Sequence, residues 1–129
     1  SGVVMTDIEL WTIADKVKEN AYSPYSNIKV GAAILTESGK VFTGVNVENS
    51  SFGATVCAER SAVVSAITAG ERSFVKIAVS GTMKSCTPCG ICRQFLSEFS
   101  DDISVVYKEP DGVLCSKKLR ELLPDSFIY

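Results

Sequence analysis

Three cysteines and one glutamate in this sequence have the types and spacing of a metal-dependent catalytic site. Cys57 is followed two residues later by Glu59, and Cys89 and Cys92 form a Cys-x-x-Cys pair further along the chain. Three thiolates suit zinc and leave its fourth position open for a water molecule. A carboxylate beside that position can serve the water as an acid or base. The four residues therefore predict a zinc-dependent hydrolase.

The chain contains no histidine, which narrows the chemistry further. Ser-His-Asp triads, His-Glu-x-x-His zinc proteases and Cys2His2 fingers are excluded. The alternative to a catalytic metal is a structural site, which normally has four protein ligands. Cys86 could supply the fourth, because Cys86, Cys89 and Cys92 also resemble part of an iron–sulfur ligand run. That alternative gives Glu59 no role, and we favour the catalytic interpretation.

Both thiol groups fall where we expect helices to begin. The unpaired N–H groups and the positive dipole end of a helix N-terminus favour thiolate over thiol. Three thiolates around Zn²⁺ still leave a net negative charge, and Arg60 is the nearest candidate to compensate it. In zinc deaminases with such ligand sets, a glutamate that does not bind the metal moves the protons. Glu59 would take a proton from water, give it to a ring nitrogen and help ammonia leave.

The composition is that of one globular domain spanning residues 1–129. The 129 residues suffice for a single core, and 46% of them are hydrophobic. The net charge of -2, without a lysine or arginine block, favours a small neutral or cationic ligand over nucleic acid. We see no membrane-spanning stretch and no signal peptide. One interpretation of residues 1–4, which precede Met5, is an expression remnant.

The five cysteines are an odd number without the spacing of a disulfide framework. This usage fits a reducing cytoplasm in which thiols are kept for metal. Hydrophobic periodicity and turn signals predict the element order α-β-β-α-β-α-β-β-α. Thr6 to Glu9 reads as a capping box that starts a helix running to Val17. The other elements are strands over residues 28–35, 41–47, 75–80, 103–108 and 113–115, and helices over residues 56–69, 88–99 and 116–123.

Two residues of types that commonly mark the ends of helices support the predicted helix boundaries. Gly70 is expected to end the second helix, and Pro88 is expected in the first turn of the third. The alternation of strands and helices implies an α/β fold with a single mixed β-sheet sandwiched by helices.

The chain resembles the small, homotetrameric, zinc-dependent class of cytidine deaminases. The resemblance covers nearly the whole chain and rests on ordered motifs: Tyr22-Ser23-Pro24-Tyr25-Ser26, Val30-Gly31-Ala32-Ala33, Gly44-Val45-Asn46-Val47-Glu48-Asn49, Cys57-Ala58-Glu59-Arg60, Pro88-Cys89-Gly90-Ile91-Cys92-Arg93-Gln94 and Glu121-Leu122-Leu123-Pro124. It implies a core sheet flanked by helices, with one zinc per chain. The ligands would be Cys57, Cys89 and Cys92, and Glu59 would be the proton shuttle.

The resemblance also implies roles in substrate binding. Asn46 and Glu48 would hold the ribose hydroxyls, Ala58 would meet the base through its backbone, and Arg60 would hydrogen-bond the thiolates. Read without the resemblance, Asn46 and Glu48 are ordinary strand-end and turn residues.

Aromatic residues from neighbouring subunits are a further implication. Phe52 and Phe127 match positions at which another chain lends a ring to the active site. The chain departs from the family at Ile28, where a phenylalanine commonly packs on the base, and at Cys86 and Asp125, which are usually Val-like and Gly. The departures concern substrate preference more than the reaction.

The expected activity is the hydrolysis of cytidine and 2′-deoxycytidine to uridine and 2′-deoxyuridine, with release of ammonia, in pyrimidine salvage. The expected protein is a cytoplasmic homotetramer with shared active sites and no nucleic-acid or membrane partner. Two alternatives stay open: a deaminase for a cytosine-nucleoside antibiotic of the blasticidin type, and a non-catalytic zinc or iron–sulfur module. The motif Asn46-Val47-Glu48-Asn49 argues against the antibiotic, because ribose binding would explain it.

Overall fold

The structure is a computed structural model that describes residues 5–129, so the interpretation of residues 1–4 as a remnant lies outside the described part. Five strands form one sheet: Val30–Thr36 (β1), Val41–Val45 (β2), Phe74–Gly81 (β3), Ser104–Lys108 (β4) and Leu114–Lys118 (β5). The helices are Asp7–Val17 (α1), Ala58–Thr68 (α2), Gly90–Ser97 (α3) and Leu119–Leu122 (α4), with 3-10 turns at Lys18–Asn20 (η1) and Phe52–Ala54 (η2).

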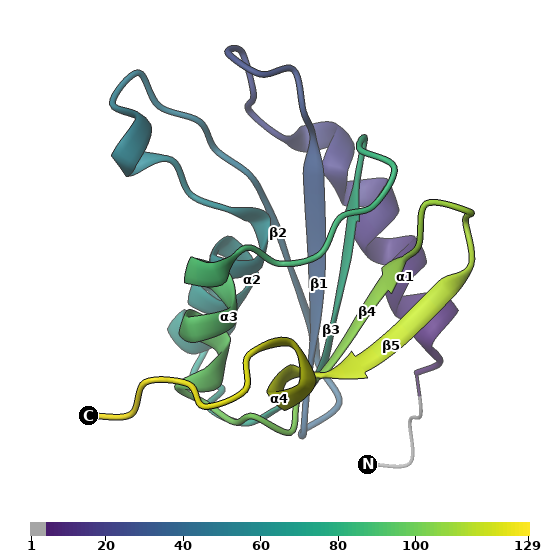
Figure 1. Ribbon diagram of the computed structural model, residues 1–129, viewed down its shortest axis with the longest axis vertical. Coiled ribbons are helices and arrows are strands. Elements are labelled where there is room, and N and C mark those ends of the chain that lie inside the picture. Colours follow the sequence, from purple (N-terminus) through teal and green to yellow (C-terminus); the bar gives the residue numbers. More distant parts are fainter. Residues whose placement is uncertain (1–4) are drawn as a thin grey trace.

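The sheet has the strand order β2-β1-β3-β4-β5 (Figure 1). β1 is antiparallel to β2 and β3, β3 is parallel to β4, and β4 is antiparallel to β5. A parallel pair needs a crossover connection, which α3 supplies here. The predicted mixed sheet between helices is therefore confirmed.

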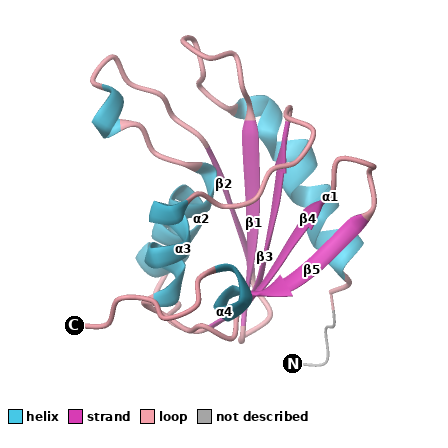
Figure 2. Cartoon of the chain, in the orientation of Figure 1, coloured by secondary structure: helices cyan, strands magenta, loops and turns pink. Residues whose placement is uncertain are grey.

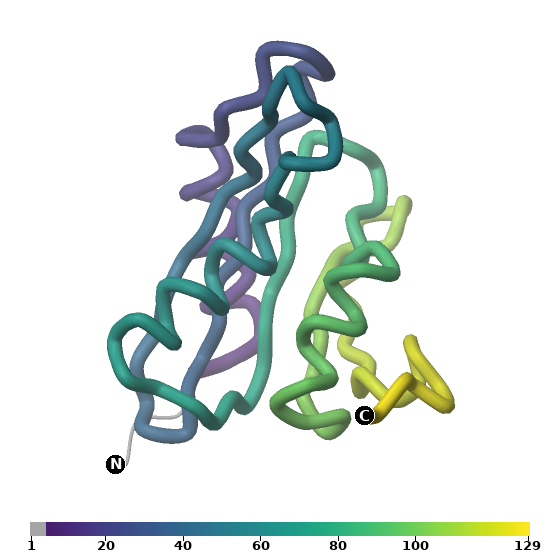
Figure 3. Tube along the Cα trace, turned by 90° about the vertical axis from the view of Figure 1, so that its left-hand side faces the viewer, coloured from purple at the N-terminus to yellow at the C-terminus, as the bar shows by residue number. Residues whose placement is uncertain are grey.

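Helices cover both faces of this sheet. α1 packs on one face, whereas α2 and α3 lie side by side on the other (Figure 3). Each face has its own apolar core, one centred on Ile77 and Val105 beneath α2 and α3, and one on Leu10 and Ala33 beneath α1. No helix within residues 5–129 combines the length and apolar character that crossing a membrane requires.

Two glycines let the helices approach the sheet closely. A Cβ atom on Gly44 would lie 2.3 Å from the backbone nitrogen of Ala62 in α2. On the other face, a Cβ on Gly31 would lie 2.1 Å from the carbonyl oxygen of Ala14 in α1. Real Cβ atoms do not approach backbone this closely, so both helices rest directly on strand backbone.

The predicted starts of the first three helices agree with the structure to within two residues, and two of the predicted boundary signals are present. Thr6 and Glu9 form the predicted capping box, and Gly70, with φ of 98°, ends α2 in the left-handed conformation. Pro88 is predicted in the first turn of the third helix, but it lies two residues before the first residue of that helix, Gly90. Cys89 is the N-cap of α3, so Pro88 precedes the helix, and its carbonyl accepts a hydrogen bond from Arg93 Nε at 2.8 Å.

The end of the chain corrects a second prediction. Residues 116–118 were assigned to the last helix, with Ser116 as its cap. They instead extend β5, where Ser116 pairs with Val106 and Lys118 pairs with Ser104. Pairing with a buried neighbouring strand outweighs the local capping signal, and α4 is a single turn that begins at Leu119.

Candidate active site

The sulfur atoms of Cys57, Cys89 and Cys92 form a compact cluster at the starts of two helices. The three Sγ atoms lie within 4.8 Å of one another. Cys57 is the N-cap of α2, Cys89 is the N-cap of α3, and Cys92 lies in the first turn of α3. The side-by-side packing of α2 and α3 thus joins thiols that are far apart in the sequence. The structure brings the predicted ligand set together, and that it holds zinc remains a prediction.

The donor set of this cluster fits zinc. Among residues 5–129, no fourth cysteine and no carboxylate belongs to the group of three sulfurs. Three soft ligands with an open fourth position are typical of a catalytic zinc site rather than a structural one.

Arg60 faces the cluster as the sequence predicted. Its Nη2 lies 3.5 Å from Cys57 Sγ and donates to the carbonyl oxygen of Thr55 at 3.3 Å. Its Nε atom is buried and has no hydrogen-bond partner in the described part of the chain. A guanidinium held against sulfur in this way favours thiolate, because it offsets negative charge in a partly desolvated place.

Two of the thiols influence each other's protonation. The pKa of Cys57 is lowered, first because the Cys92 thiol hydrogen-bonds its sulfur and then, against the effect of burial, because Arg60 is near. The pKa of Cys92 is raised by the same interaction and by burial. The metal-free pair therefore retains a proton that a bound metal ion would displace, as metal binding to thiols generally does.

Glu59 lies two residues beyond the Cys57 cap, in the first turn of α2, and is only 4% exposed. Burial raises the pKa of Glu59 to about 7, and the nearby Cys57 thiolate acts in the same direction. None of the ion pairs within the described residues includes this carboxyl group. A carboxyl that titrates near neutrality can both accept and return a proton, as the predicted shuttle requires.

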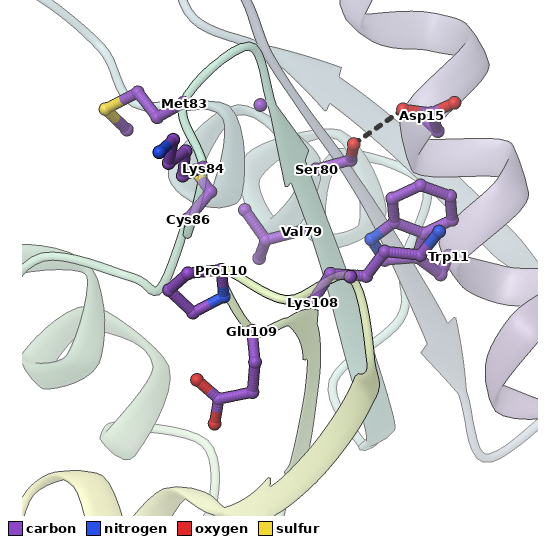
Figure 4. A pocket seen from close by; sticks show the side chains of 12 residues that line it. Trp11, Asp15, Val79, Ser80, Met83, Lys84, Cys86, Lys108, Glu109 and Pro110 are labelled. Atoms are coloured by element: carbon purple, nitrogen blue, oxygen red, sulfur yellow. Dashed lines mark hydrogen bonds between the residues drawn. The ribbon is translucent and has the colours of Figure 1, made fainter.

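Cys86 does not belong to the cluster. It lines a cavity of about 190 Å³ together with Trp11, Val79 and Pro110 (Figure 4). Burial raises the pKa of the Cys86 thiol to about 12, and the charges of Glu59 and Cys57 act in the same direction. The Cys86 sulfur is not among the three that lie within 4.8 Å of one another. A four-cysteine site that includes Cys86 therefore does not fit this arrangement.

Two loops project beyond one end of the sheet, one before β1 and one after β2 (Figure 2). Asn46 and Glu48, the predicted sugar-binding residues, both lie after β2. Glu48 follows the end of β2, and its side chain contacts the loop before β1. Its Oε1 accepts hydrogen bonds from the backbone nitrogens of Tyr25 at 3.0 Å and Ser26 at 3.1 Å, and its Oε2 accepts one from the Ser26 hydroxyl. These contacts border a cavity of about 370 Å³ that Phe52 and Thr55 also line.

Asn46 is nearly buried and acts as a brace between the same loops. Its Oδ1 accepts a hydrogen bond from the Val30 nitrogen at 2.8 Å, and its Nδ2 donates to the Ile28 carbonyl at 2.8 Å. One N–H of the amide is left for a ligand. Ribose binding by Asn46 stays a prediction. Its two hydrogen bonds to the backbone of Ile28 and Val30 are a structural role that the sequence did not indicate.

The remaining predicted residues lie at different depths. Ala58 is fully buried at the start of α2, and Ile28 is half-buried in the loop before β1. The rings of Phe52 and Phe127 are 78% and 72% exposed. The Phe52 ring meets Tyr25 edge-on at 6.2 Å between centroids, and the Phe127 carbonyl accepts a hydrogen bond from Gln94 at 3.0 Å.

Comparison with known proteins agrees with this geometry. Residues 5–108 match the family model described as the cytidine and deoxycytidylate deaminase zinc-binding region. A probable cytidine deaminase of Dictyostelium discoideum is 47% identical over 116 residues, which are 88% of this chain and 78% of that protein. The cytidine deaminase of Sporosarcina psychrophila is 42% identical over 114 residues, covering 87% of this chain and 84% of the relative.

Solved structures resemble the fold over almost its whole length. The crystal structure of cytidine deaminase from Burkholderia pseudomallei has a TM-score of 0.90 and 46% identity, covering 95% of this chain and 100% of that one. The cytidine deaminase of Mycobacterium tuberculosis has a TM-score of 0.87 and 35% identity, covering 98% of this chain and 100% of that one.

Proposed function

Since this chain belongs to the cytidine deaminase family and is an enzyme that deaminates cytidine, we propose that it hydrolyses cytidine and 2′-deoxycytidine to uridine and 2′-deoxyuridine at one zinc ion per chain. The observation that carries the proposal is the cluster of Cys57, Cys89 and Cys92 beside the buried Glu59. The alternative of a non-catalytic metal module is set aside by family membership. We assign this reaction to pyrimidine salvage, because its substrates and products are free pyrimidine nucleosides.

Cys57, Cys89 and Cys92 would hold the zinc ion, which would supply the Lewis acidity that makes a water molecule nucleophilic near neutral pH. The carboxylate of Glu59 takes a proton from the attacking water and delivers it to N3 of the cytosine ring. Once the water oxygen is bonded to C4, the same carboxylate takes the second proton from the new C4 hydroxyl and gives it to the exocyclic amino group. The C4–N bond then breaks, the C4 carbonyl of uridine forms and ammonia leaves. Burial of Glu59 keeps this proton from exchanging freely with solvent.

Arg60 and the two helix starts balance the charge of the site. The guanidinium near Cys57 Sγ and the N-termini of α2 and α3 all present positive potential to the thiolates. Less negative sulfurs leave the metal a stronger Lewis acid, so Arg60 supports catalysis without touching the substrate.

The substrate is the free nucleoside, because the sugar end of the site presents an anion. Hydrogen bonds from Ser26 and Tyr25 lower the pKa of Glu48 and hold it ionised. A carboxylate accepts hydrogen bonds from neutral hydroxyls but repels a 5′-phosphate. The chain as a whole, with net charge -2, offers phosphates no general attraction.

We expect kcat/KM for cytidine to exceed that for CMP by at least about a hundredfold, since Glu48 repels the 5′-phosphate and CMP lacks the free 5′-hydroxyl. The assay follows the ultraviolet change of cytidine, CMP, a cytosine-containing oligonucleotide and blasticidin S at equal salt. Glu48→Gln serves as the matched variant and should narrow the gap between cytidine and CMP. Equal rates on CMP, the oligonucleotide or the antibiotic would contradict the nucleoside assignment.

We further propose a cytoplasmic homotetramer with shared active sites. All five cysteines are free thiols, which suits a reducing compartment. Phe52 is exposed in η2, and Phe127, Ile128 and Tyr129 are exposed in the C-terminal segment. These are two separate apolar surfaces that neighbouring subunits could cover.

Mixing two inactive variants tests the sharing of sites. Glu59→Gln chains lack the proton carrier, and Phe127→Ala chains lack the ring that we place in a neighbour's site. When the two are unfolded and refolded together, mixed tetramers should regain part of the activity that neither shows alone. Refolding each variant with itself is the control. A monomer in sedimentation at micromolar concentration, or no regain in a mixed tetramer, would refute the shared site.

A further inference from the structure

The hydroxyl group of Ser26 has its hydrogen-bonding directions fixed from both sides. Its Oγ accepts a hydrogen bond from the backbone nitrogen of Ile28 at 3.0 Å. A hydroxyl has one proton to donate, and this proton is directed to Oε2 of Glu48. The serine thus connects the residue at the base-binding position with the carboxylate at the sugar-binding position.

The backbone around Ser26 is shaped for the same contact. Asn27 adopts a left-handed conformation with φ of 61°, and its nitrogen donates to the Ser23 carbonyl at 3.0 Å. This turn aims the Tyr25 and Ser26 nitrogens at Oε1 of Glu48. Asparagine tolerates the left-handed region better than most residues, so the sequence supports this tight turn.

Glu48 consequently has three donors that fix the plane of its carboxylate. Its remaining lone pairs border the cavity that Phe52 and Thr55 line. An exposed glutamate without such contacts would lose side-chain entropy on binding a hydroxyl. In this structure the Glu48 carboxylate is already ordered by its three hydrogen bonds before a substrate binds.

We propose that Ser26 is a positioning residue for sugar recognition, which orients the Glu48 carboxylate so that the enzyme selects nucleosides carrying ribose hydroxyls. This inference rests on the proposed nucleoside deaminase function and adds a residue outside the predicted site. Ser26 itself does not contact the reacting atoms. A purely structural serine would instead stabilise the loop and affect all substrates alike.

The test compares cytidine with 2′,3′-dideoxycytidine, which has the same base but lacks both ring hydroxyls. Ser26→Ala should lower kcat/KM for cytidine about tenfold, the size expected for a hydrogen bond to a charged group, and mainly through KM. The value for the dideoxy analogue should change by less than about twofold, because Glu48 has no hydroxyl to bind there.

Three further variants sharpen the result. Ser26→Thr keeps the hydroxyl and should retain most of the preference for cytidine, whereas Ser26→Cys keeps the size but is a weak donor and should behave like alanine. Ser73→Ala, at an exposed serine far from the site, controls for loss of a surface hydroxyl. In a Glu48→Gln background, Ser26→Ala should cost little more.

Equal loss on both substrates, or fully additive effects with Glu48→Gln, would overturn the role of Ser26. Should Ser26→Ala fail to fold, as judged by its thermal unfolding, the comparison of Ser26→Cys with Ser26→Thr decides. Failure of the proposed function is a separate outcome, in which the unmodified enzyme loaded with zinc leaves cytidine unchanged.

Discussion

Replacing Glu59 with glutamine is expected to remove nearly all turnover while leaving zinc and the fold in place. Glutamine has almost the same shape as glutamate but cannot carry a proton. Loss of one proton-transfer group typically costs on the order of 10²–10⁴-fold. Glu59 serves more than one step in the proposed reaction, so the loss should reach or exceed the upper end. The fold should persist because the buried carboxyl forms no ion pair among the described residues.

The measurement combines steady-state rates with zinc content of the same preparation. Glu59→Asp is the matched control, since it keeps an ionisable group but withdraws it by one methylene, and should retain more activity than the amide. Circular dichroism and thermal unfolding should be close to those of the unmodified protein. Substantial turnover in a zinc-replete Glu59→Gln enzyme would exclude Glu59 as the proton carrier.

A second large effect is expected from Cys92→Ala, which should lose both zinc and activity. Cys92 contributes one of three sulfurs in the cluster and is fully buried. Removing even an outer partner of a metal ligand costs roughly 10–100-fold in affinity or activity. Removing one of only three ligands should cost more. The substitution changes little volume, so the core should tolerate it.

Cys86→Ala is the control that this chain provides for that experiment. Both cysteines are buried, but the Cys86 sulfur is not one of the three in the cluster. Elemental analysis should give one zinc per chain for Cys86→Ala and a substoichiometric value for Cys92→Ala. Parallel zinc loss in both variants would indicate four sulfur ligands and return the site to the structural class.

The metal-binding half of this site could be predicted from sequence because it depends on short-range rules. Cys89 and Cys92 share a helix turn through their spacing, and Cys57 and Cys89 lie at helix starts that apolar periodicity and Pro88 predict to within two residues. These local rules do not predict that the two helices pack side by side. The resemblance to the family implied that their cysteines share one site.

The sugar-binding half could not be predicted in the same way. The contact between Ser26 and Glu48 joins residues 22 positions apart across two loops, and no local pattern specifies such a pair. Ribose binding by Asn46 stays a prediction, and the sequence did not indicate that its amide also holds the backbone of Ile28 and Val30. The extension of β5 through Ser116 was missed for a related reason, because strand pairing with β4 is decided by a partner distant in sequence.

The direct contact between Gly44 and α2 has a consequence for how this enzyme can diverge. At Gly44 the helix that follows Cys57 and carries Glu59 lies directly against strand backbone, with no side chain between them. Its height above the sheet is therefore largely insensitive to drift in the volumes of surrounding core residues. Lineages can exchange one aliphatic residue for another around this contact without displacing the proton carrier. The core residues around this contact can therefore vary, whereas position 44 cannot, because even a methyl group there would tilt the catalytic helix.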